Sequence, residues 1–289
     1  MIAIDAQWRA DNPLPVIAEP VSKKTRGRVL AVGGSRLAQG AIRLTAEAAL
    51  RAGAGSVRIA TLQSVAPVLA QFLPEAGIVP LPEADGEIGA FDAGTIRHQV
   101  VRHDAVVLGC GITDEGVAAR LLRCILETPP DDTHLLLDAA ALACAKPLRE
   151  ALVRLGGRLV FTPHEGEMAA LSGRSIEAVR EAAADVAAEI AERYAAVVVL
   201  KGGTTVIANP AGTCLHYPGG GPGMATGGSG DVLAGVIGGL LARGTPPLAA
   251  AAWGVWLHGQ AGRTLASRIG PVGFLARELL PELPRLLPR

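Results

Sequence analysis

The sequence predicts an α/β fold in which helices cover a mainly parallel β-sheet. Short apolar runs of strand length alternate along the chain with segments of helical periodicity, as they do in parallel sheets joined by crossover helices. The chain has 289 residues, of which 49% are hydrophobic, so it can bury a large core. Neither an internal repeat nor a break in composition divides it. We therefore expect a single domain over residues 28–289, preceded by a polar, proline-bearing extended arm over residues 1–27.

The expected strands and helices are bounded by glycine, proline or polar residues. The expected strands are residues 28–33, 56–60, 105–108, 134–138, 158–162, 197–201, 204–208 and 214–216. The expected helices are residues 41–51, 65–72, 115–126, 139–145, 176–193, 231–242, 248–266 and 275–287. The spacing of apolar residues separates the two classes. Residues 209–212, between the last two strands, indicate a hairpin turn.

Composition and charge argue against several classes of function. The chain carries 27 basic and 27 acidic residues and no basic stripe, so nucleic acid is not an expected partner. The N-terminus has an acid at Asp5 and no apolar segment, so it does not read as a signal peptide. Every apolar stretch falls short of the ~18–20 residues that a membrane span needs. The four cysteines form no CxxC or Cys/His cluster, so we expect no zinc site, no disulfides and a cytoplasmic location.

The most informative segment is the glycine-rich run at residues 219–239, GGGPGMATGGSGDVLAGVIGG, in which ten of 21 residues are glycine. Glycines let backbone N–H groups approach a ligand, and the helix expected from Asp231 onward adds unpaired N–H groups and a positive dipole end. This combination typically binds phosphate. Asp231 would repel a phosphate, so we interpret it as a base that takes a proton from a nucleophile beside the phosphate. The alternative is that Asp231 only caps the helix.

Other chemically notable residues follow directly after expected strands: Gly109, Asp138, His164 and Lys201. Ligands of open α/β sheets bind beyond the carboxyl ends of the strands, so these residues are expected to share one edge of the sheet.

Each of these positions also has a plainer interpretation. Gly109 and Gly111, like the adjacent Gly33 and Gly34, could line a ligand or simply form turns, and the dinucleotide fingerprint GxGxxG is not met. Asp138 could hold Mg²⁺ through water, or cap the helix expected at 139–145.

The two most specific motifs contain His164 and Lys201. His164 is presented after Thr162-Pro163 just before a helix, and we expect it to contact substrate rather than to be merely structural. Lys201 and the glycines after it could hold a nucleotide phosphate, or form a hairpin turn with a solvated lysine. The P-loop pattern, paired-histidine metal spacings and the GxSxG nucleophile motif are all lacking.

Taken together, these motifs resemble the NAD(P)H-hydrate dehydratases, ADP-dependent repair enzymes of the ribokinase-like superfamily. The resemblance runs from about residue 27 to 262. Its segments are RVLAVGGS and ALRAGAGSVRIAT within residues 28–61, LLLDAAAL at 135–142, TPHEGEM at 162–168, LKGGTTVIANPAG at 200–212 and GMATGGSGDVLAG at 223–235. The chain departs from the family pattern in three places. The family's usual GPGLG motif is Gly109-Cys110-Gly111-Ile112-Thr113 in this chain. The asparagine that often precedes PGMATGG in the family is Gly221 here. The family's N-terminal Lys-Gly is represented only by Lys23, Lys24 and Gly27.

The resemblance implies a three-layer α/β/α sandwich and a defined reaction. The hydroxyl of hydrated NADH or NADPH, in its (S)-form, is phosphorylated from ADP and phosphate is then eliminated, which yields NAD(P)H, AMP and phosphate. Asp231 is the implied base, and Mg²⁺ bridges the nucleotide phosphates. ATP is a possible alternative donor.

The resemblance also implies three groups of site residues, and it assigns no protein ligand to a metal. The hydrate would contact Ala41, Gly109, Gly111, His164 and Asp231. The nucleotide would contact Lys201, Gly202, Gly203, Thr204, Thr205 and Gly230. The loop that stabilises the transferred phosphoryl group would be Gly227, Gly228, Ser229 and Gly230.

Further implications concern partners and alternatives. A homo-oligomer is expected, with the tetramer as the usual form of the family, and a separate epimerase is expected to interconvert the hydrate forms. Two other functions remain open at this point. One is a small-molecule kinase of the same superfamily that acts on a thiazole or hydroxymethylpyrimidine. The other is a catalytically inactive nucleotide sensor, although such a protein would not need the carboxylate of Asp231.

Overall fold

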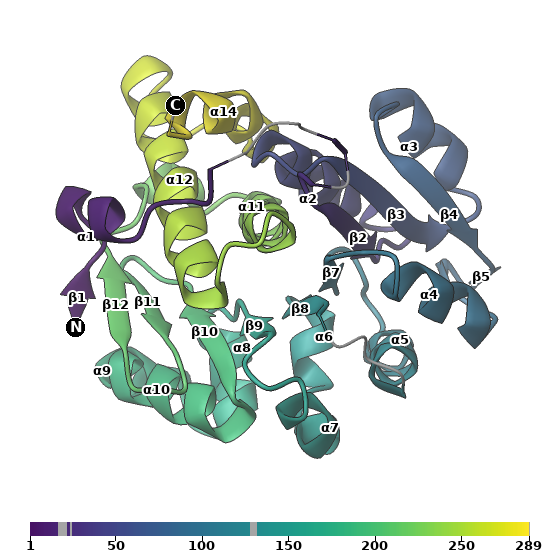
Figure 1. Cartoon of the computed structure of the whole chain (residues 1–289), viewed down its shortest axis with the longest axis horizontal. Helices are drawn as coiled ribbons and strands as arrows, with labels where there is room; N and C mark the ends of the chain where they lie inside the picture. The colour runs from purple at the N-terminus through teal and green to yellow at the C-terminus, as the bar shows by residue number, and fades with distance from the viewer. Residues whose placement is uncertain (17–21, 24, 128–131, 289) are drawn as a thin grey trace.

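A ten-stranded sheet organises the computed structural model, which describes residues 1–16, 22–23, 25–127 and 132–288 (Figure 1). The strand order is β1-β12-β11-β10-β9-β8-β7-β2-β3-β4, and a separate hairpin is formed by β5 and β6. The strands are β1 (Ile2–Ala3), β2 (Arg28–Val32), β3 (Ser56–Leu62), β4 (Gly77–Leu81), β5 (Glu83–Ala84), β6 (Glu87–Ile88), β7 (Ala105–Leu108), β8 (His134–Leu137), β9 (Leu159–Phe161), β10 (Ala196–Leu200), β11 (Thr205–Ala208) and β12 (Cys214–Tyr217).

The sheet is mainly parallel, as the sequence predicts. All pairs from β10 through β9, β8, β7, β2 and β3 to β4 are parallel, whereas β10, β11 and β12 form an antiparallel meander. The central strands β7, β8, β9 and β10 are almost entirely buried, because helices cover both faces of a parallel sheet.

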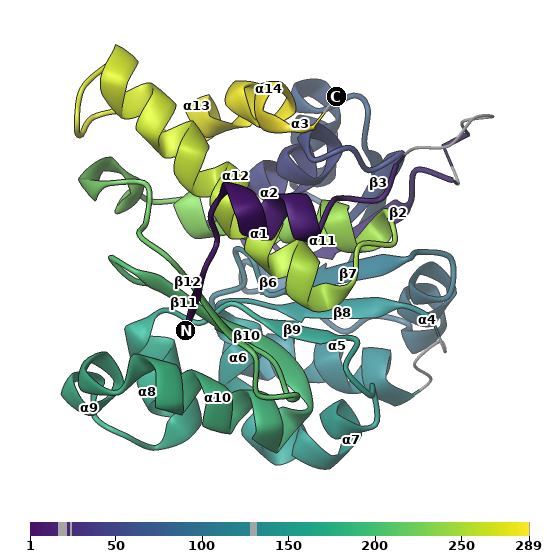
Figure 2. The same cartoon turned by 60° about the vertical axis from the view of Figure 1, so that its left-hand side comes forward.

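Helices form a layer on each face of the sheet (Figure 2). One layer contains α2 (Gln39–Arg51), α11 (Ser229–Ala242) and α12 (Pro247–Arg268), together with the short helices α13 (Ala276–Leu279) and α14 (Leu283–Leu286). The other contains α4 (Ala93–Val100), α5 (Glu115–Glu127), α6 (Ala140–Ala143), α7 (Arg149–Val153), α8 (Glu165–Ser172), α9 (Ile176–Glu181) and α10 (Ala183–Tyr194). Helix α3 (Ala66–Phe72) packs beside β4. The three-layer α/β/α architecture is thus confirmed.

Helix α11, which begins at the glycine loop, packs with unusual closeness against α2. A Cβ added to Gly235 would lie 2.2 Å from the backbone oxygen of Thr45, and one added to Gly239 would lie 2.6 Å from that of Ala49. On the opposite side of α11, Gly238 contacts Val107 of β7. These small residues let the helix lie flat between α2 and the sheet, which fixes the position of its N-terminus.

We expect Gly235→Ala to destabilise the fold by about 1–3 kcal/mol, because the new methyl group must push α11 away from α2. Chemical denaturation of the variant and the wild type measures the difference. A control is Gly212→Ala, which places no atom within 4 Å of a neighbour and tests only the strain of a positive φ. Equal stability of Gly235→Ala and the wild type would show that the α2–α11 contact is not tight.

The N-terminal arm is more ordered than an extended segment. Strand β1 pairs with β12, and helix α1 (Ala6–Asp11) follows it, with Asp5 accepting a hydrogen bond from the backbone N–H of Trp8 at 2.8 Å. The guanidinium of Arg9 lies 3.8 Å from the ring centre of Trp256, and Trp253 Nε1 donates to the carbonyl of Asn12. This part of the arm is therefore docked on α12. Residues 17–21 and Lys24 lie outside the described residues.

The structure also corrects several expected elements. The helix expected at 176–193 is two helices, α9 and α10, separated at Ala182, whose backbone leaves the helical region with φ −123° and ψ 39°. The helix expected at 275–287 is broken into short pieces around Pro281 and Pro284, because proline lacks the N–H that a continuous helix needs. Strand β4 was not predicted, and its Pro80 is tolerated because β4 is the edge strand.

No described helix is both long and apolar enough to cross a membrane. The carboxyl ends of β7, β8, β9 and β10 meet at one edge of the sheet, where the start of α11 also lies. That edge carries the residues that the sequence singled out.

Candidate functional site

The glycine loop ends at the first turn of α11, and Asp231 lies within that turn. Gly228 is the residue that caps the helix, with φ +90° and without a side-chain cap, so the interpretation of Asp231 as the N-cap is wrong. A Cβ on Gly228 would lie 2.6 Å from Leu44 Cδ1, which explains the need for glycine there. The side chain of Asp231 is therefore available for chemistry at the start of the helix.

Asp138 forms a buried ion pair with Lys201. Its Oδ1 lies 2.8 Å from Lys201 Nζ and accepts a 2.7 Å hydrogen bond from Thr162 Oγ1. The residue that precedes α6 as its cap is Ala139, so Asp138 does not cap that helix. Nor is Lys201 a solvated turn residue, because only 21% of its side chain is exposed. The cap interpretation of Asp138 is thus wrong; residues 201–204 do form the turn between the antiparallel strands β10 and β11, but Lys201 is not solvated there.

Asp231 and Cys110 both lie close to this ion pair. One ligating atom from each of Cys110, Asp138 and Asp231 lies within 4.8 Å of the other two. Such a group could attract a metal ion, but the ammonium of Lys201 already neutralises Asp138. We therefore assign no metal ligand here.

The surroundings of this cluster shift the pKa values of Asp231, Lys201 and Glu167. Burial, and next the charge of Asp138, raises the pKa of Asp231 to about 6, while a hydrogen bond from Cys110 and the charge of Lys201 act in the opposite direction. Burial opposes the charged form of Lys201, but the carboxylates of Asp138 and Glu167 outweigh it and raise its pKa. Burial also raises the pKa of Glu167, whose Oε2 lies 3.9 Å from Lys201 Nζ. The ammonium of Lys201 thus acts electrostatically on the carboxylates of Asp138, Glu167 and Asp231.

A cavity of about 1030 Å³ opens beside this cluster. Its polar wall contains Lys201 and the glycines that follow it, and its far wall is the loop that leads into α11. The sequence-predicted residues that line it are His164, Lys201, Gly202, Gly203, Thr205, Ser229 and Gly230. Thr204 lines a smaller adjoining pocket with Lys201 and Gly202. The segments around Lys201 and the glycine loop therefore line one cavity, and binding of a ligand there remains a prediction.

Gly230 connects the cavity to the charged cluster. A Cβ at this position would lie 3.4 Å from Lys201 Nζ and 3.9 Å from Asp138 Oδ2. A side chain would therefore partly cover the ion pair, whereas glycine leaves it open.

His164 begins helix α8 and lies at the mouth of the cavity. Its Nδ1 accepts hydrogen bonds from the backbone N–H groups of Gly166 and Glu167, and the Glu167 carboxylate accepts one from the His164 N–H. This capping box fixes the ring, and 61% of the side chain is exposed. A contact between His164 and substrate remains a prediction, with Nε2 as the nitrogen not used by the cap.

Ala41, Gly109 and Gly111 do not line this cavity. A Cβ on Gly111 would lie 3.0 Å from that of Ala41, and one on Gly109 would lie 1.9 Å from the backbone oxygen of Asp138. The structure therefore brings Ala41 and Gly111 together and packs Gly109 against the end of β8. Gly227, Gly228 and Asp231 also lie outside the lining of the large cavity.

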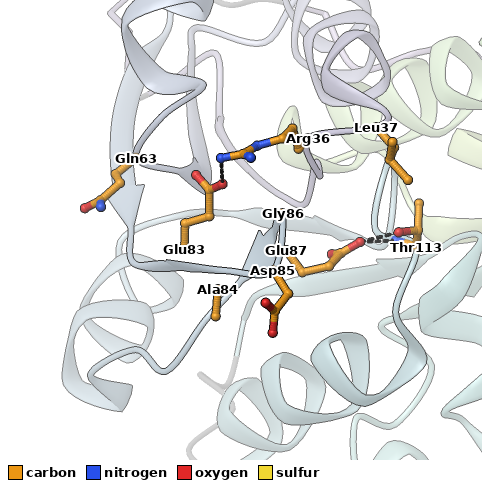
Figure 3. A pocket seen from close by; sticks show the side chains of 9 residues that line it. All are labelled: Arg36, Leu37, Gln63, Glu83, Ala84, Asp85, Gly86, Glu87 and Thr113. Atoms are coloured by element: carbon orange, nitrogen blue, oxygen red, sulfur yellow. Dashed lines mark hydrogen bonds and ion pairs between the residues drawn. The ribbon is translucent and has the colours of Figure 1, made fainter.

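A second cavity, of about 710 Å³, was not anticipated from the sequence (Figure 3). Arg36 and Leu37 face the β5–β6 hairpin across it, and Thr113 closes one end through a hydrogen bond to Glu87. Arg36 pairs with Glu83 at 2.6 Å, so the charge of its guanidinium is already neutralised by that carboxylate. The remaining carboxylates make this cavity a poor site for phosphate.

Sequence reasoning also missed His258, which lines the large cavity from the middle of α12. Its Nε2 lies 3.1 Å from Ser229 Oγ, and burial followed by the charge of Lys201 lowers its pKa to about 4, so the ring is neutral. A histidine within a long apolar helix gives no sequence signal of such a role, because only packing against α11 brings it to the site.

This arrangement defines a class of protein. A mainly parallel sheet, a glycine loop at a helix N-terminus and an acid in the first turn of that helix characterise a nucleotide-utilising member of the ribokinase-like superfamily. The profile of the NAD(P)H-hydrate dehydratase family matches residues 29–285. The chain belongs to this family.

Individual relatives agree with the family assignment. An ADP-dependent (S)-NAD(P)H-hydrate dehydratase of Xanthomonas campestris is 46% identical over 283 residues, which are 96% of this chain and 93% of the relative. A bifunctional NAD(P)H-hydrate repair enzyme of Moorella thermoacetica is 40% identical; the match covers 98% of this chain but only 53% of the relative. An ADP/ATP-dependent NAD(P)H-hydrate dehydratase of Bacillus subtilis, crystallised with ATP and Mg²⁺, has a TM-score of 0.78 and 29% identity, over 94% of this chain and 92% of the relative.

Proposed function

We propose that this protein is an ADP-dependent dehydratase of the (S)-form of hydrated NADH and NADPH. It phosphorylates the hydrate hydroxyl and then eliminates phosphate, so that NAD(P)H, AMP and phosphate are the products. The observation that carries the proposal is the half-buried carboxylate of Asp231 with its raised pKa, placed at the first turn of α11 beside a glycine loop and a large cavity. The matches to dehydratases over nearly the whole chain support it.

Each part of the site has a role in this reaction. Asp231 accepts the proton of the hydrate hydroxyl, and the oxygen then attacks the terminal phosphorus of ADP, with AMP as the leaving group. Backbone N–H groups at Gly228 and Gly230, at the positive end of α11, stabilise the charge of the transferred phosphoryl group, whereas the N–H of Ser229 donates to the carbonyl of Thr226 and holds the loop. The N–H groups act without reorganisation, because the loop is fixed by the packing of α11.

The two ligands occupy opposite sides of the charged cluster. We place the nucleotide in the large cavity, along Lys201, Gly202, Gly203, Thr204, Thr205 and Gly230. The nicotinamide hydrate faces Asp231 from the side of Ala41, Gly109 and Gly111, with His164 at the mouth. Lys201 donates to Asp138 and still reaches the cavity, so an ammonium N–H remains for phosphate.

Mg²⁺ fits this site as a companion of the nucleotide. The relative that was crystallised with ATP and Mg²⁺ supports its use. The cluster of Asp138, Glu167 and Asp231 carries more negative charge than Lys201 alone balances. The binding of a cation together with the phosphates is therefore electrostatically favourable. When bound, Mg²⁺ supplies charge neutralisation of the phosphate oxygens. ADP is the proposed donor, with ATP as the alternative.

The test is incubation of the protein with hydrated NADH, Mg²⁺ and either ADP or ATP. Recovery of the absorbance band of reduced nicotinamide, with AMP formed from ADP, is the expected result. A thiazole or hydroxymethylpyrimidine kinase would leave the hydrate unchanged and phosphorylate its own substrate, and an inactive sensor would bind nucleotide without any product. Either outcome would overturn the proposal.

We expect kcat to fall as the pH decreases through about 6. The base acts as a carboxylate, and burial together with the charge of Asp138 raises its pKa to about 6, so it is protonated below that pH and inactive. A pH profile of kcat with saturating hydrate and nucleotide measures this decrease, which is the acidic limb of the profile. A flat profile down to pH 4.5 would contradict the assignment of Asp231 as the base.

We further propose that residues 28–289 act as one catalytic domain, that the protein forms a homo-oligomer such as a tetramer, and that it works with an epimerase. The bifunctional repair enzymes are about twice as long as this chain, which supports a separate epimerase partner. A cytoplasmic location also remains a proposal, supported by the four free cysteines.

A further inference from the structure

We propose that Cys110 is a positioning residue for the base, whose thiol holds the carboxylate of Asp231 apart from that of Asp138. This inference rests on the proposed function. It concerns a position where the family's usual motif has proline, which has neither a thiol nor any other side-chain donor.

The first observation is the place of the thiol. Cys110 lies two residues beyond the end of β7 and is fully buried. Its Sγ lies 3.9 Å from Asp138 Oδ2 and within 4.8 Å of a carboxylate oxygen of Asp231. The thiol thus donates to Asp138 and has the carboxylate of Asp231 close beside it.

The second observation is the set of charges around Asp231. Asp138 at the end of β8 repels it, and Lys201 at the end of β10 attracts it, but Lys201 is already held at 2.8 Å by Asp138. Thr45 of α2 contacts the thiol from the other side, and Glu167 of α8 acts on the cluster through Lys201. Cys110 is the uncharged donor beside Asp231, and hydrogen bonding from it lowers the pKa of Asp231.

The thiol must act as a donor and not as an anion. Burial and the two carboxylates raise the pKa of Cys110 well above its usual value, so it stays protonated at any working pH. A protonated thiol between two carboxylates donates to one and separates it from the other. It therefore favours the ionised form of Asp231, which is the form that accepts the proton of the hydrate.

Removal of the thiol should have a characteristic effect. In Cys110→Ala, Asp231 loses its donor and faces Asp138 directly, so the acidic limb of the kcat profile should move up by about one pH unit. In Cys110→Ser, a stronger hydroxyl donor replaces the thiol, so the limb should stay in place or move down. The Kd for ADP should change less than about threefold in both variants, because Cys110 does not line the nucleotide cavity.

The experiment compares pH profiles of kcat for the wild type, Cys110→Ala and Cys110→Ser, with Cys124→Ala as the matched control. Cys124 is also buried but lies on α5, bonded to the carbonyl of Ala93. An unshifted limb in Cys110→Ala, or the same shift in the Ala and Ser variants, would overturn the inference, because a packing role would not distinguish a donor from a methyl group.

A second measurement keeps the inference testable without turnover. Carbon-13 NMR of aspartate-labelled protein follows the titration of the Asp231 carboxyl directly, with Asp231→Asn used to assign the signal. The same upward shift of its titration midpoint is expected in Cys110→Ala. If the wild type does not dehydrate the hydrate, the proposed function fails, while this titration still decides whether Cys110 acts on Asp231.

Discussion

Asp231→Asn should lower kcat by about 10²–10⁴-fold, because the amide cannot accept the proton of the hydrate hydroxyl. Asparagine has the same shape, and Asp231 does not line the nucleotide cavity, so the glycine loop and that cavity should be unchanged. The Kd for ADP should therefore stay within about threefold of the wild type. Single-turnover kinetics and calorimetric titration with ADP measure the two quantities separately.

The same variant should not lose stability at pH 8. The pKa of Asp231 is raised in the fold, from 3.8 to about 6, so its ionisation opposes folding. The stabilisation of the protonated form is complete below pH 4 and is lost as the pH rises through 6, which amounts to at most about 3 kcal/mol. Asp231→Asn should thus unfold at the same or a higher temperature than the wild type at pH 8. Normal turnover of Asp231→Asn would show that Asp231 is not the base. A large loss of stability at pH 8 would contradict the raised pKa of Asp231.

The sequence was sufficient for the architecture because apolar patterns determine it. Strand β7, for example, is a run of four buried residues between polar neighbours, and its bounds coincide with the expected ones. The elements that were missed have weak local signals. Strand β1 has two residues and depends on pairing with β12, and β4 contains a proline that is acceptable only at the edge of the sheet.

The candidate site was predictable where its residues follow strands. Asp138 and Lys201 were placed at the same edge of the sheet because parallel strands present their carboxyl ends together. Their direct contact was not predictable, because it depends on the strand order β10-β9-β8 and on the side-chain directions. Cys110 was noticed only as a departure from a motif. Its position between two carboxylates follows from the packing of α11 against β7.

The ion pair of Lys201 leads to the second large effect. Lys201→Met should destabilise the protein by about 3–5 kcal/mol at pH 8, because it leaves the buried carboxylate of Asp138 and the half-buried carboxylates of Glu167 and Asp231 without a cation. The loss should be smaller at pH 5, where the carboxyls with raised pKa values, Glu167 and Asp231, can protonate. Urea denaturation at the two pH values measures this difference.

Two companion variants separate the charge from the side-chain volume. Lys146→Met makes the same change at an exposed position and should alter stability by less than about 0.5 kcal/mol. Adding Asp138→Asn to Lys201→Met should recover most of the lost stability. Removing both members of the ion pair leaves one fewer unpaired charge than removing the lysine alone. If Lys201→Met is as stable as the wild type, the lysine does not neutralise the cluster.

Lys201 should also contribute to nucleotide binding beyond its structural role. In the stabilised double variant, the affinity for ADP should fall by about tenfold or more, since a charge-assisted hydrogen bond to phosphate is lost, while the affinity for the hydrate changes less. Calorimetric titration of each ligand measures the two effects in a protein that remains folded. An unchanged Kd for ADP would mean that Lys201 interacts only with the carboxylates. The phosphate would then be bound by the backbone N–H groups of the loop alone.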